Sequence, residues 1–317
     1  MRLIPEYEPV CELYLSFVHE FFNTRFRYGQ ALCEIIAAAN SFVGVELFVS
    51  LLDMENWFAE ERGNPLCQSS EYCINNDSPN RAILMEYVPF FAEDEGGQPV
   101  GLVFRNPHLE EPEKLKQFSQ RMVRNLGIPC VDMGFDFASA HVAVNENLVL
   151  LSDHWFQGEE GAVRLEYFQS HFPEQAFHVV PSLAGDITND LDMFLWPIKP
   201  KVWIASEYPA GSPQAESMEP ALRVLNDYGH IVHRVPGLEP IIHDDINTMP
   251  NYANGVILNQ AALVPAYQQE EDGTVQSILK DLGFQVFPID CRQVILTNSG
   301  VHCISKTVPA QVVKEEN

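Results

Sequence analysis

Short apolar runs alternate with amphipathic stretches of helical period along most of this chain. The apolar runs fit buried strands, and the amphipathic stretches fit helices that pack on a sheet. The predicted strands lie at residues 11–17, 45–49, 82–85, 101–104, 129–131, 140–144, 148–151, 177–180, 192–195, 201–205, 231–233, 254–258, 261–265, 284–287 and 294–296. The predicted helices cover residues 30–40, 113–125, 163–171, 215–228 and 274–282. This alternation predicts an α/β fold.

A unit of strands, one helix and a further strand recurs about five times. Gly127, Gly229 and Gly283 follow three of the predicted helices, where a left-handed C-terminal cap is favoured. Five units of similar length favour a radial arrangement around a central channel. The alternative is an ordinary α/β sheet in which the even spacing is a coincidence.

The composition limits the classes of partner. The 317 residues include 44 Asp and Glu against 19 Lys and Arg, which gives a formal net charge of −25. Nucleic acids and anionic membranes need a basic surface, so neither is expected as a partner. An acidic protein attracts cationic substrates, although solubility alone also explains the charge. No apolar run of about 18 residues predicts a membrane span.

Cysteine usage indicates a reducing compartment and singles out one thiol. The seven cysteines show no metal-ligand spacing, and the N-terminus has no apolar signal region, which together fit the cytoplasm rather than a disulfide framework or a metal site. Cys303 follows the predicted strand at residues 294–296 and a Ser299-Gly300 turn. Such a turn can present a nucleophilic thiol to a cavity, whereas the simpler alternative is a cysteine packed in the core.

The C-terminal part of the chain resembles a known superfamily. The stretch Asn251 to Asn259, the run Val286 to Asp290 and the tail Ser299-Gly300-Val301-His302-Cys303 look like the guanidine-modifying, or pentein, superfamily. The tail is most similar to agmatine deiminases and bacterial-type peptidylarginine deiminases. The resemblance implies a five-bladed α/β propeller made by a single domain, residues 1–317. Its units would lie near residues 8–60, 68–128, 129–182, 186–235 and 251–309.

The resemblance also implies a reaction and its residues. A Cys thiolate attacks a guanidinium carbon, a covalent amidino-thioether forms, and water releases the product without a cofactor. Cys303 matches the nucleophile, and Asp192 matches the Asp of the family's His-x-Asp motif. Asp77 resembles the first Asp that binds the guanidinium, so that Asp77 and Asp192 would hold its N–H edges. Asp190 stands where the family has its His, and could take a proton only if its pKa were raised.

Three further residues, His154, Asp132 and Arg81, have two interpretations each. His154, at the end of a predicted strand, is a candidate for the missing catalytic His or an ordinary surface residue. His302 would point to the other face of a strand from Cys303 and is interpreted as structural. Asp132 either lines the channel or caps a strand, and Arg81 either binds a substrate carboxylate or pairs with surface acids. Asp77 itself fits an Asx turn equally well.

The sequence therefore predicts a cytoplasmic hydrolase of the deiminase type, acting on a small cationic guanidine or an arginine side chain. It predicts no cofactor, no metal, no nucleic-acid or membrane partner, and leaves a homodimer open. One alternative is an amidinotransferase, in which an amine replaces water. The other is a pentein that binds a cationic ligand without turnover, because Asp190 replaces the usual His.

Overall fold

The computed structural model describes residues 1–18, 28–50, 53–54, 70–75, 82–243 and 246–312. Five sheets share one construction in this part of the chain: an antiparallel pair of strands, then a helix, then a strand parallel to its neighbour. The helices are α1 (Tyr28–Ala39), α4 (Pro112–Asn125), α5 (Gly158–His171), α6 (Pro213–Asp227) and α7 (Glu271–Asp281). The mixed α/β class that the sequence predicts is confirmed.

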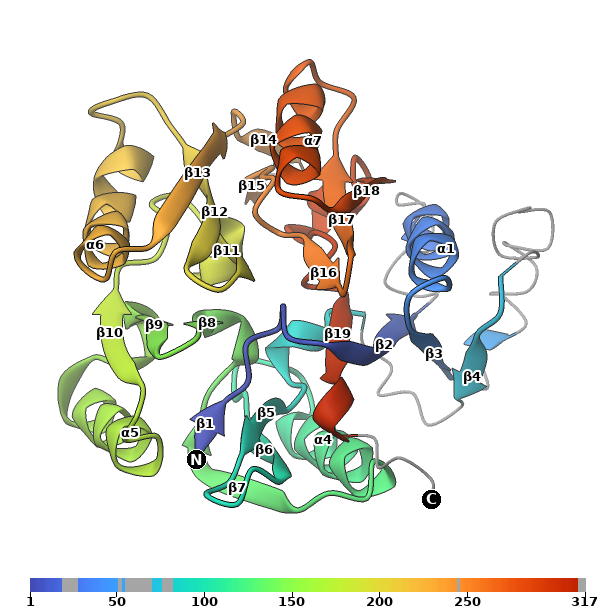
Figure 1. Ribbon diagram of the computed structural model, residues 1–317, viewed down its shortest axis with the longest axis vertical. Coiled ribbons are helices and arrows are strands. Elements are labelled where there is room, and N and C mark those ends of the chain that lie inside the picture. Colours follow the sequence, from blue (N-terminus) through green and yellow to red (C-terminus); the bar gives the residue numbers. More distant parts are fainter. Residues whose placement is uncertain (19–27, 51–52, 55–69, 76–81, 244–245, 313–317) are drawn as a thin grey trace.

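The sheets follow one another along the chain, and each helix lies on the outer side of its own sheet (Figure 1). The first contains β19 (Ser305–Pro309), β2 (Val10–Phe17), β3 (Gly44–Val49) and β4 (Cys73–Asn75). The second contains β1 (Arg2–Leu3), β5 (Phe90–Glu93), β6 (Pro99–Arg105) and β7 (Cys130–Asp136). The third contains β8 (Val142–Asn145), β9 (Leu148–Ser152) and β10 (Ala176–Val180).

The last two of these sheets and a small hairpin complete the described part of the fold. The fourth sheet contains β11 (Leu195–Lys199), β12 (Val202–Glu207) and β13 (Ile231–Pro236). The fifth contains β16 (Val256–Leu258), β17 (Ala261–Ala266) and β18 (Gln285–Asp290). The hairpin joins β14 (Ile241–His243) to β15 (Ile246–Thr248).

The two ends of the chain tie the sheets together. The last strand, β19, pairs antiparallel with β2 of the first sheet, with Thr307 opposite Leu13. The short strand β1 pairs with β5 of the second sheet. Between β1 and β2 the chain crosses the middle of the molecule, and this places Glu6 among the inner ends of the sheets (Figure 1).

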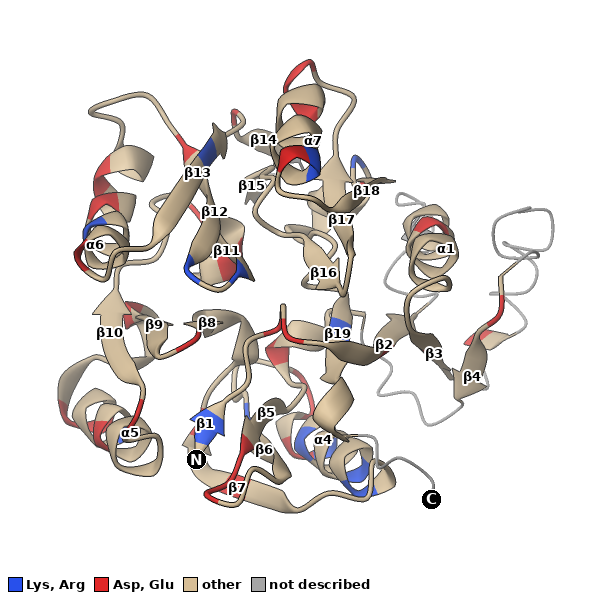
Figure 2. Ribbon diagram, viewed as in Figure 1, with Lys and Arg blue, Asp and Glu red and all other residues tan. Residues whose placement is uncertain are grey.

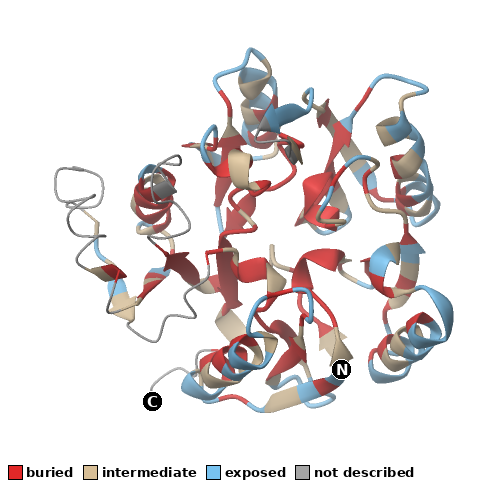
Figure 3. Ribbon diagram, turned by 180° about the vertical axis from the view of Figure 1, so that it is seen from behind, coloured by how far each residue is buried: buried red, intermediate tan, exposed pale blue. Residues whose placement is uncertain are grey.

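Each helix buries one side against its sheet, as its apolar spacing dictates. On α4, Leu115, Phe118 and Met122 are buried and stand at helical spacing on one face, whereas the opposite face is exposed. Figure 3 shows the same division throughout, with buried strands inside and exposed helix faces outside. Each buried large apolar side chain contributes about 1.5–3 kcal/mol of stability.

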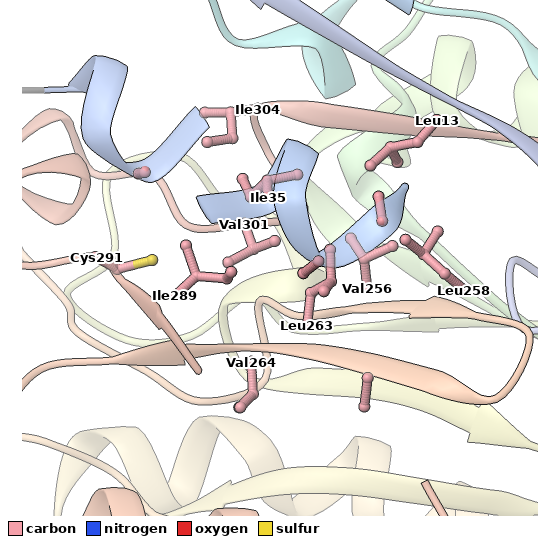
Figure 4. Packing of buried hydrophobic residues seen from close by; sticks show 14 of the residues in the cluster. Leu13, Ile35, Val256, Leu258, Leu263, Val264, Ile289, Cys291, Val301 and Ile304 are labelled. Atoms are coloured by element: carbon pink, nitrogen blue, oxygen red, sulfur yellow. The ribbon is translucent and has the colours of Figure 1, made fainter. Parts of the chain in front are cut away.

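The largest apolar cluster joins the fifth sheet to the first. Leu13 of β2 and Ile35 of α1 meet Leu263 and Ile289 of the fifth sheet, and all four are almost wholly buried (Figure 4). Val301, two residues before Cys303, belongs to the same cluster. The turn that carries Cys303 is therefore anchored in the core where the chain ends meet.

Three predicted strands are 3₁₀ turns instead. Residues 82–85, 192–195 and 294–296 were expected as strands, but the structure has η2 (Leu84–Glu86), η5 (Leu191–Met193) and η6 (Val294–Thr297) there. A fourth turn, η3 (Ser139–His141), precedes β8 and contacts both η2 and η5. A short apolar run shows that a segment is buried, but it does not separate a strand from a buried turn. These turns carry the side chains of the candidate site.

Acidic side chains are spread over the outer helices, whereas many of the basic ones gather on α4 (Figure 2). Cys33 of α1 is disulfide-bonded, which departs from the expectation of cysteines without disulfides. Five other cysteines are free: Cys11, Cys73, Cys130, Cys291 and Cys303. Within the residues that the structure describes, none of the helices has the length and apolar character needed to cross a membrane.

Candidate active site

Cys303 lies in a tight turn that precedes β19, not in a strand. Residues 301–304 form consecutive turns between η6 and β19, and Asn298 at the end of η6 has a left-handed backbone with a φ of 55°. Gly300 is needed for space rather than for a positive φ, because a Cβ atom there would lie 2.5 Å from Asn254 Oδ1. The glycine therefore lets the turn close against Asn254.

Asn254 holds the turn and the thiol with one side chain. Its Oδ1 accepts hydrogen bonds from the backbone N–H groups of His302 (2.9 Å) and Cys303 (3.2 Å). Its Nδ2 donates to Cys303 Sγ at 3.0 Å. Asn251 fixes Asn254 in turn, because its Oδ1 accepts from the Asn254 backbone N–H at 2.9 Å. The sulfur position is thus set by a buried amide from the fifth unit.

Asp192 stands directly beside the thiol. It lies in η5, is 7% exposed, and its Oδ2 is 3.5 Å from Cys303 Sγ. The same oxygen accepts a hydrogen bond from His302 Nδ1 at 2.7 Å. Asp192 Oδ1 is also buried, and within the described residues it has no hydrogen-bond partner. Buried carboxylate oxygens normally have partners, so this oxygen can accept from a ligand N–H group.

His302 connects Asp192 to the segment that crosses the middle of the molecule. Its Nε2 lies 2.5 Å from Glu6 Oε2, and Lys306 Nζ lies 2.5 Å from Glu6 Oε1. Burial lowers the pKa of His302, but Glu6 and Asp192 outweigh this effect and raise it to about 10. His302 is therefore a cation at neutral pH. The interpretation of His302 as a residue on the far face of a strand is wrong, because the residues around it form a turn.

Asp190 sits at the N-terminal cap of η5 and is nearly fully buried. Its loop is organised by Asp186, which accepts hydrogen bonds from Thr188 Oγ1 (2.6 Å) and from the backbone N–H of Asn189 (2.8 Å). Burial, followed by the charges of Asp192, Asp186 and Glu86, raises the pKa of Asp190 well above its ordinary value. Burial and these neighbouring acids therefore favour the protonated form of Asp190.

His141 faces Asp190 from the neighbouring turn. His141 Nε2 lies 3.2 Å from Asp190 Oδ1, and both residues are buried. Burial, with the nearby rings of His154 and His108, lowers the pKa of His141 to about 3. A largely neutral imidazole thus lies within contact distance of the Asp190 carboxyl group.

Glu86 is a further acid of the cluster, at the end of η2. The backbone N–H of Met85 donates to the carbonyl of Cys303 at 3.2 Å, which ties this turn to the nucleophile's turn. Met85 also accepts a short hydrogen bond from Ser139 Oγ of η3. The charge of Glu86 is one of the causes that raise the pKa of Asp190. Glu86 therefore lies close to Asp190, although the sequence did not single it out.

A cavity lies beside this cluster in the middle of the molecule. Its polar lining includes Asp192, His302, Glu6 and Lys306, and its walls are apolar side chains of the inner strands, such as Trp196. Burial, and then the charges of Asp192 and Asp190, raise the pKa of the Cys303 thiol well above its ordinary value. These effects therefore favour the protonated thiol over the thiolate.

The structure separates the predicted site residues into three groups. Cys303, Asp190 and Asp192 lie together, as described above. Asp77 and Arg81 lie outside the described residues. The remaining two, Asp132 and His154, are placed away from the thiol.

Asp132 and His154 have other neighbours. Asp132 pairs with Lys116 of α4 at 2.6 Å and is half-exposed, so the structure does not bring it into the cluster. The exposed ring of His154 stacks on His141, with centroids 5.4 Å apart, and its other side meets His108 at 5.7 Å. His154 therefore reaches the cluster only through His141.

Four residues of the cluster were missed in the sequence. Glu86, His141 and Asn254 come from three different units, and Glu6 comes from the N-terminal segment. One signal was available for His141: it ends a small-residue run directly before the strand β8, and Asp192 stands similarly close to the start of β11. All these turns meet at the inner ends of the sheets. A position in such a turn therefore indicates a site residue better than closeness to Cys303 in the sequence does.

Comparisons with known proteins agree with this arrangement. Residues 166–309 match the family of Porphyromonas-type peptidyl-arginine deiminases. No curated protein is related to the chain by sequence at a significant level. Among solved structures, the agmatine deiminase of Enterococcus faecalis is similar with a TM-score of 0.82 and 16% identity, covering 98% of this chain and 96% of its own.

Two other solved structures show the same fold. An agmatine deiminase variant of C. jejuni with substrate bound has a TM-score of 0.80 and 15% identity, with 96% of this chain and 95% of that chain covered. DDAH from Pseudomonas aeruginosa has a TM-score of 0.57 and 11% identity, with 95% and 100% covered. The fold of the whole chain and the family match over residues 166–309 together confirm the resemblance to the guanidine-modifying superfamily.

Proposed function

We propose that the protein is a hydrolase of the deiminase type that acts on a small guanidine or an arginine-like side chain. The observation that carries the proposal is the position of Asp192 beside the buried Cys303 thiol, with Oδ2 at 3.5 Å and Oδ1 without a partner among the described residues. A guanidinium nitrogen that donates to Oδ1 lies next to the sulfur, and its carbon is then within reach of attack.

The reaction balances with these groups. The sulfur bonds to the guanidinium carbon, one C–N bond breaks, and the thiol proton leaves on the nitrogen as ammonia. Water then adds to the carbon of the amidino-thioether and the C–S bond breaks. The thiol is restored, a ureido product leaves, and the remaining proton is taken up by ammonia. Asp192 holds the N–H edge throughout, and Glu86 is proposed as the second acid that faces the cation.

Electrostatics favour a cationic substrate. Burial and the charges of Asp192 and Asp190 favour the protonated thiol of Cys303. A guanidinium placed against Asp192 offsets these acids, so the pKa of Cys303 falls as the substrate binds. The substrate thereby creates the thiolate that attacks it. The family match and the substrate-bound agmatine deiminase relative support this choice of substrate class.

The fold supports the same proposal. We propose that the five similar sheets are the blades of a five-bladed α/β propeller, that residues 1–317 form a single domain, and that the cavity beside the cluster is its central channel. The pairing of β19 with β2 joins the end of the chain to the first sheet, as a closed ring requires. The five free cysteines support the cytoplasm as the location, whereas the disulfide of Cys33 is typical of an oxidising compartment. Light scattering after gel filtration tests for a homodimer.

One experiment tests the proposed reaction. The protein is incubated with agmatine, arginine, methylated arginine and an arginyl peptide, and ammonia, ureido product and a mass adduct on Cys303 are measured. Cys303→Ala should abolish both product and adduct. Added amines should not appear in the product, since their incorporation would indicate an amidinotransferase. Binding that raises the melting temperature without product or adduct from any compound would replace the enzyme by a binding protein.

A further inference from the structure

The pair formed by His141 and Asp190 has the features of a proton-handling site. The two side chains come from neighbouring units, η3 and the N-terminal cap of η5, and meet at 3.2 Å in a buried position. Asp190 occupies the place where the resemblance leads one to expect a histidine. The imidazole absent from that place is therefore supplied across the interface between two turns, 49 positions earlier in the chain (190 minus 141).

A purely structural histidine usually has both ring nitrogens satisfied when it is buried. His141 Nδ1 is buried and has no hydrogen-bond partner among the described residues, whereas Nε2 faces Asp190. His230 is a contrasting case, because its Nδ1 accepts a hydrogen bond from Trp203 Nε1 at 2.7 Å. Nε2 is therefore the ring nitrogen through which His141 can exchange a proton with Asp190.

We propose that His141 and Asp190, from two neighbouring units, together take over the role of the histidine expected at position 190. His141 supplies the imidazole, Asp190 supplies a carboxyl group, and the pair moves the protons of the deiminase reaction. Asp190 gives its proton to the leaving nitrogen, and the thiol proton refills the pair. In the second half, the pair passes a proton from the attacking water to the departing sulfur. The inference rests on the proposed deiminase function and extends it, because neither group alone suits this task.

The reason for the pairing is the cost of a lone charge. If Asp190 lost its proton with no partner, a carboxylate would be left buried beside Asp192 and Glu86, which is unfavourable. Because the thiol proton refills the pair, the total charge of the pair does not change over the step, and the His141 ring, 3.2 Å from Asp190, can hold that proton in transit. His141 acts through Asp190 and is a positioning residue, whereas the charge of Asp190 acts on the Cys303 thiol.

The test uses the full-length protein and the guanidine substrate that it turns over fastest. His141→Gln and Asp190→Asn should each lower kcat by about 10²-fold or more, change KM by less than about tenfold, and remove one limb of the pH profile of kcat. The double variant His141→Asp with Asp190→His returns the imidazole to the other turn and should recover at least about tenfold over either single variant. His230→Gln, the loss of another buried imidazole, should leave kcat unchanged.

The outcomes are distinguishable. Turnover by His141→Gln within about threefold of the wild type, with an unchanged pH profile, overturns the inference but leaves the deiminase function intact. A double variant that is no more active than the single variants also overturns the inference that His141 supplies the imidazole expected at position 190. An inactive wild-type protein with no Cys303 adduct refutes the deiminase function and the inference together. If His141→Gln does not fold, Asp190→Asn and the double variant give the same decision.

Discussion

The protonated state of His302 predicts that stability is lost on the alkaline side. Its ring lies between Glu6 at 2.5 Å and Asp192 at 2.7 Å, and these carboxylates raise its pKa from 6.5 to about 10. A group with a raised pKa in the folded state contributes stability that is fully present below its unfolded pKa. That contribution is lost as the pH rises from 6.5 to 10, because the folded protein must then release a proton it holds tightly.

The size of the effect follows from the pKa difference. The difference between 6.5 and about 10, at about 1.36 kcal/mol per pKa unit, sets an upper limit of about 5 kcal/mol on the stability lost across this interval. His302→Gln keeps a hydrogen-bonding side chain but removes the titration. The variant should therefore be less stable than the wild type at pH 6.5, and the two free energies of unfolding should converge toward pH 10.

Urea unfolding followed by circular dichroism measures this directly at pH 6.5, 8 and 10. His230→Gln is the matched control: burial lowers the pKa of His230, so its removal should not alter the alkaline slope. Parallel curves for the wild type and His302→Gln would refute the reasoning. A wild-type stability that increases between pH 6.5 and 10 relative to the variant would do so as well.

Two substitutions test the packing and the charges around the cluster. Gly300→Ala places a Cβ atom 2.5 Å from Asn254 Oδ1 and should lower the stability by about 1–3 kcal/mol and remove much of the activity. The control Gly273→Ala has open space around it in α7 and should be neutral or slightly stabilising in urea unfolding. Equal effects of the two substitutions would contradict the close contact at Gly300. Glu6→Gln leaves the buried Lys306 ammonium (3% exposed) and His302 without a counter-charge. Because Glu6 itself is one-third exposed, we expect a loss of about 2–3 kcal/mol, seen as about 3–5 °C in melting temperature at about 2.1 cal/mol/K per residue. Glu113→Gln, which breaks an exposed pair with Arg105 at 3.2 Å, should cost less than about 1 kcal/mol, and an equal shift for both glutamates would contradict the buried role of Glu6.

The repeating part of the fold is predictable because its signals are local. Helical period, strand alternation and glycines such as Gly229, which has a φ of 70° after α6, mark the elements. The inner turns are not local in this sense. Residues 192–195 are apolar enough for a strand, but the backbone bends at η5 because this turn packs against η3 of the preceding unit. Only tertiary contacts decide whether such an apolar segment forms a strand or a 3₁₀ turn.

The candidate site follows the same division. Cys303, Asp190 and Asp192 could be found because the resemblance gives their sequence positions. His141 could not, since nothing in residues 139–141 indicates which carboxyl group the ring will face. The choice of His154 came close, because its ring stacks on His141, yet it lies on the exposed side of that ring. Burial decides between the two histidines, and burial depends on the neighbouring units.

The acids of the cluster carry less net negative charge than their number suggests. Burial and the neighbouring acids favour the protonated form of Asp190, and Asp192 is offset by the cationic His302. A bound guanidinium offsets the negative charge that appears when Asp190 gives up its proton, so substrate binding and proton release reinforce each other. The same coupling acts on Cys303, whose pKa is raised by these acids until a cation offsets them. A buried thiol that ionises only beside its substrate is protected from oxidation at other times, because the thiolate is the reactive form.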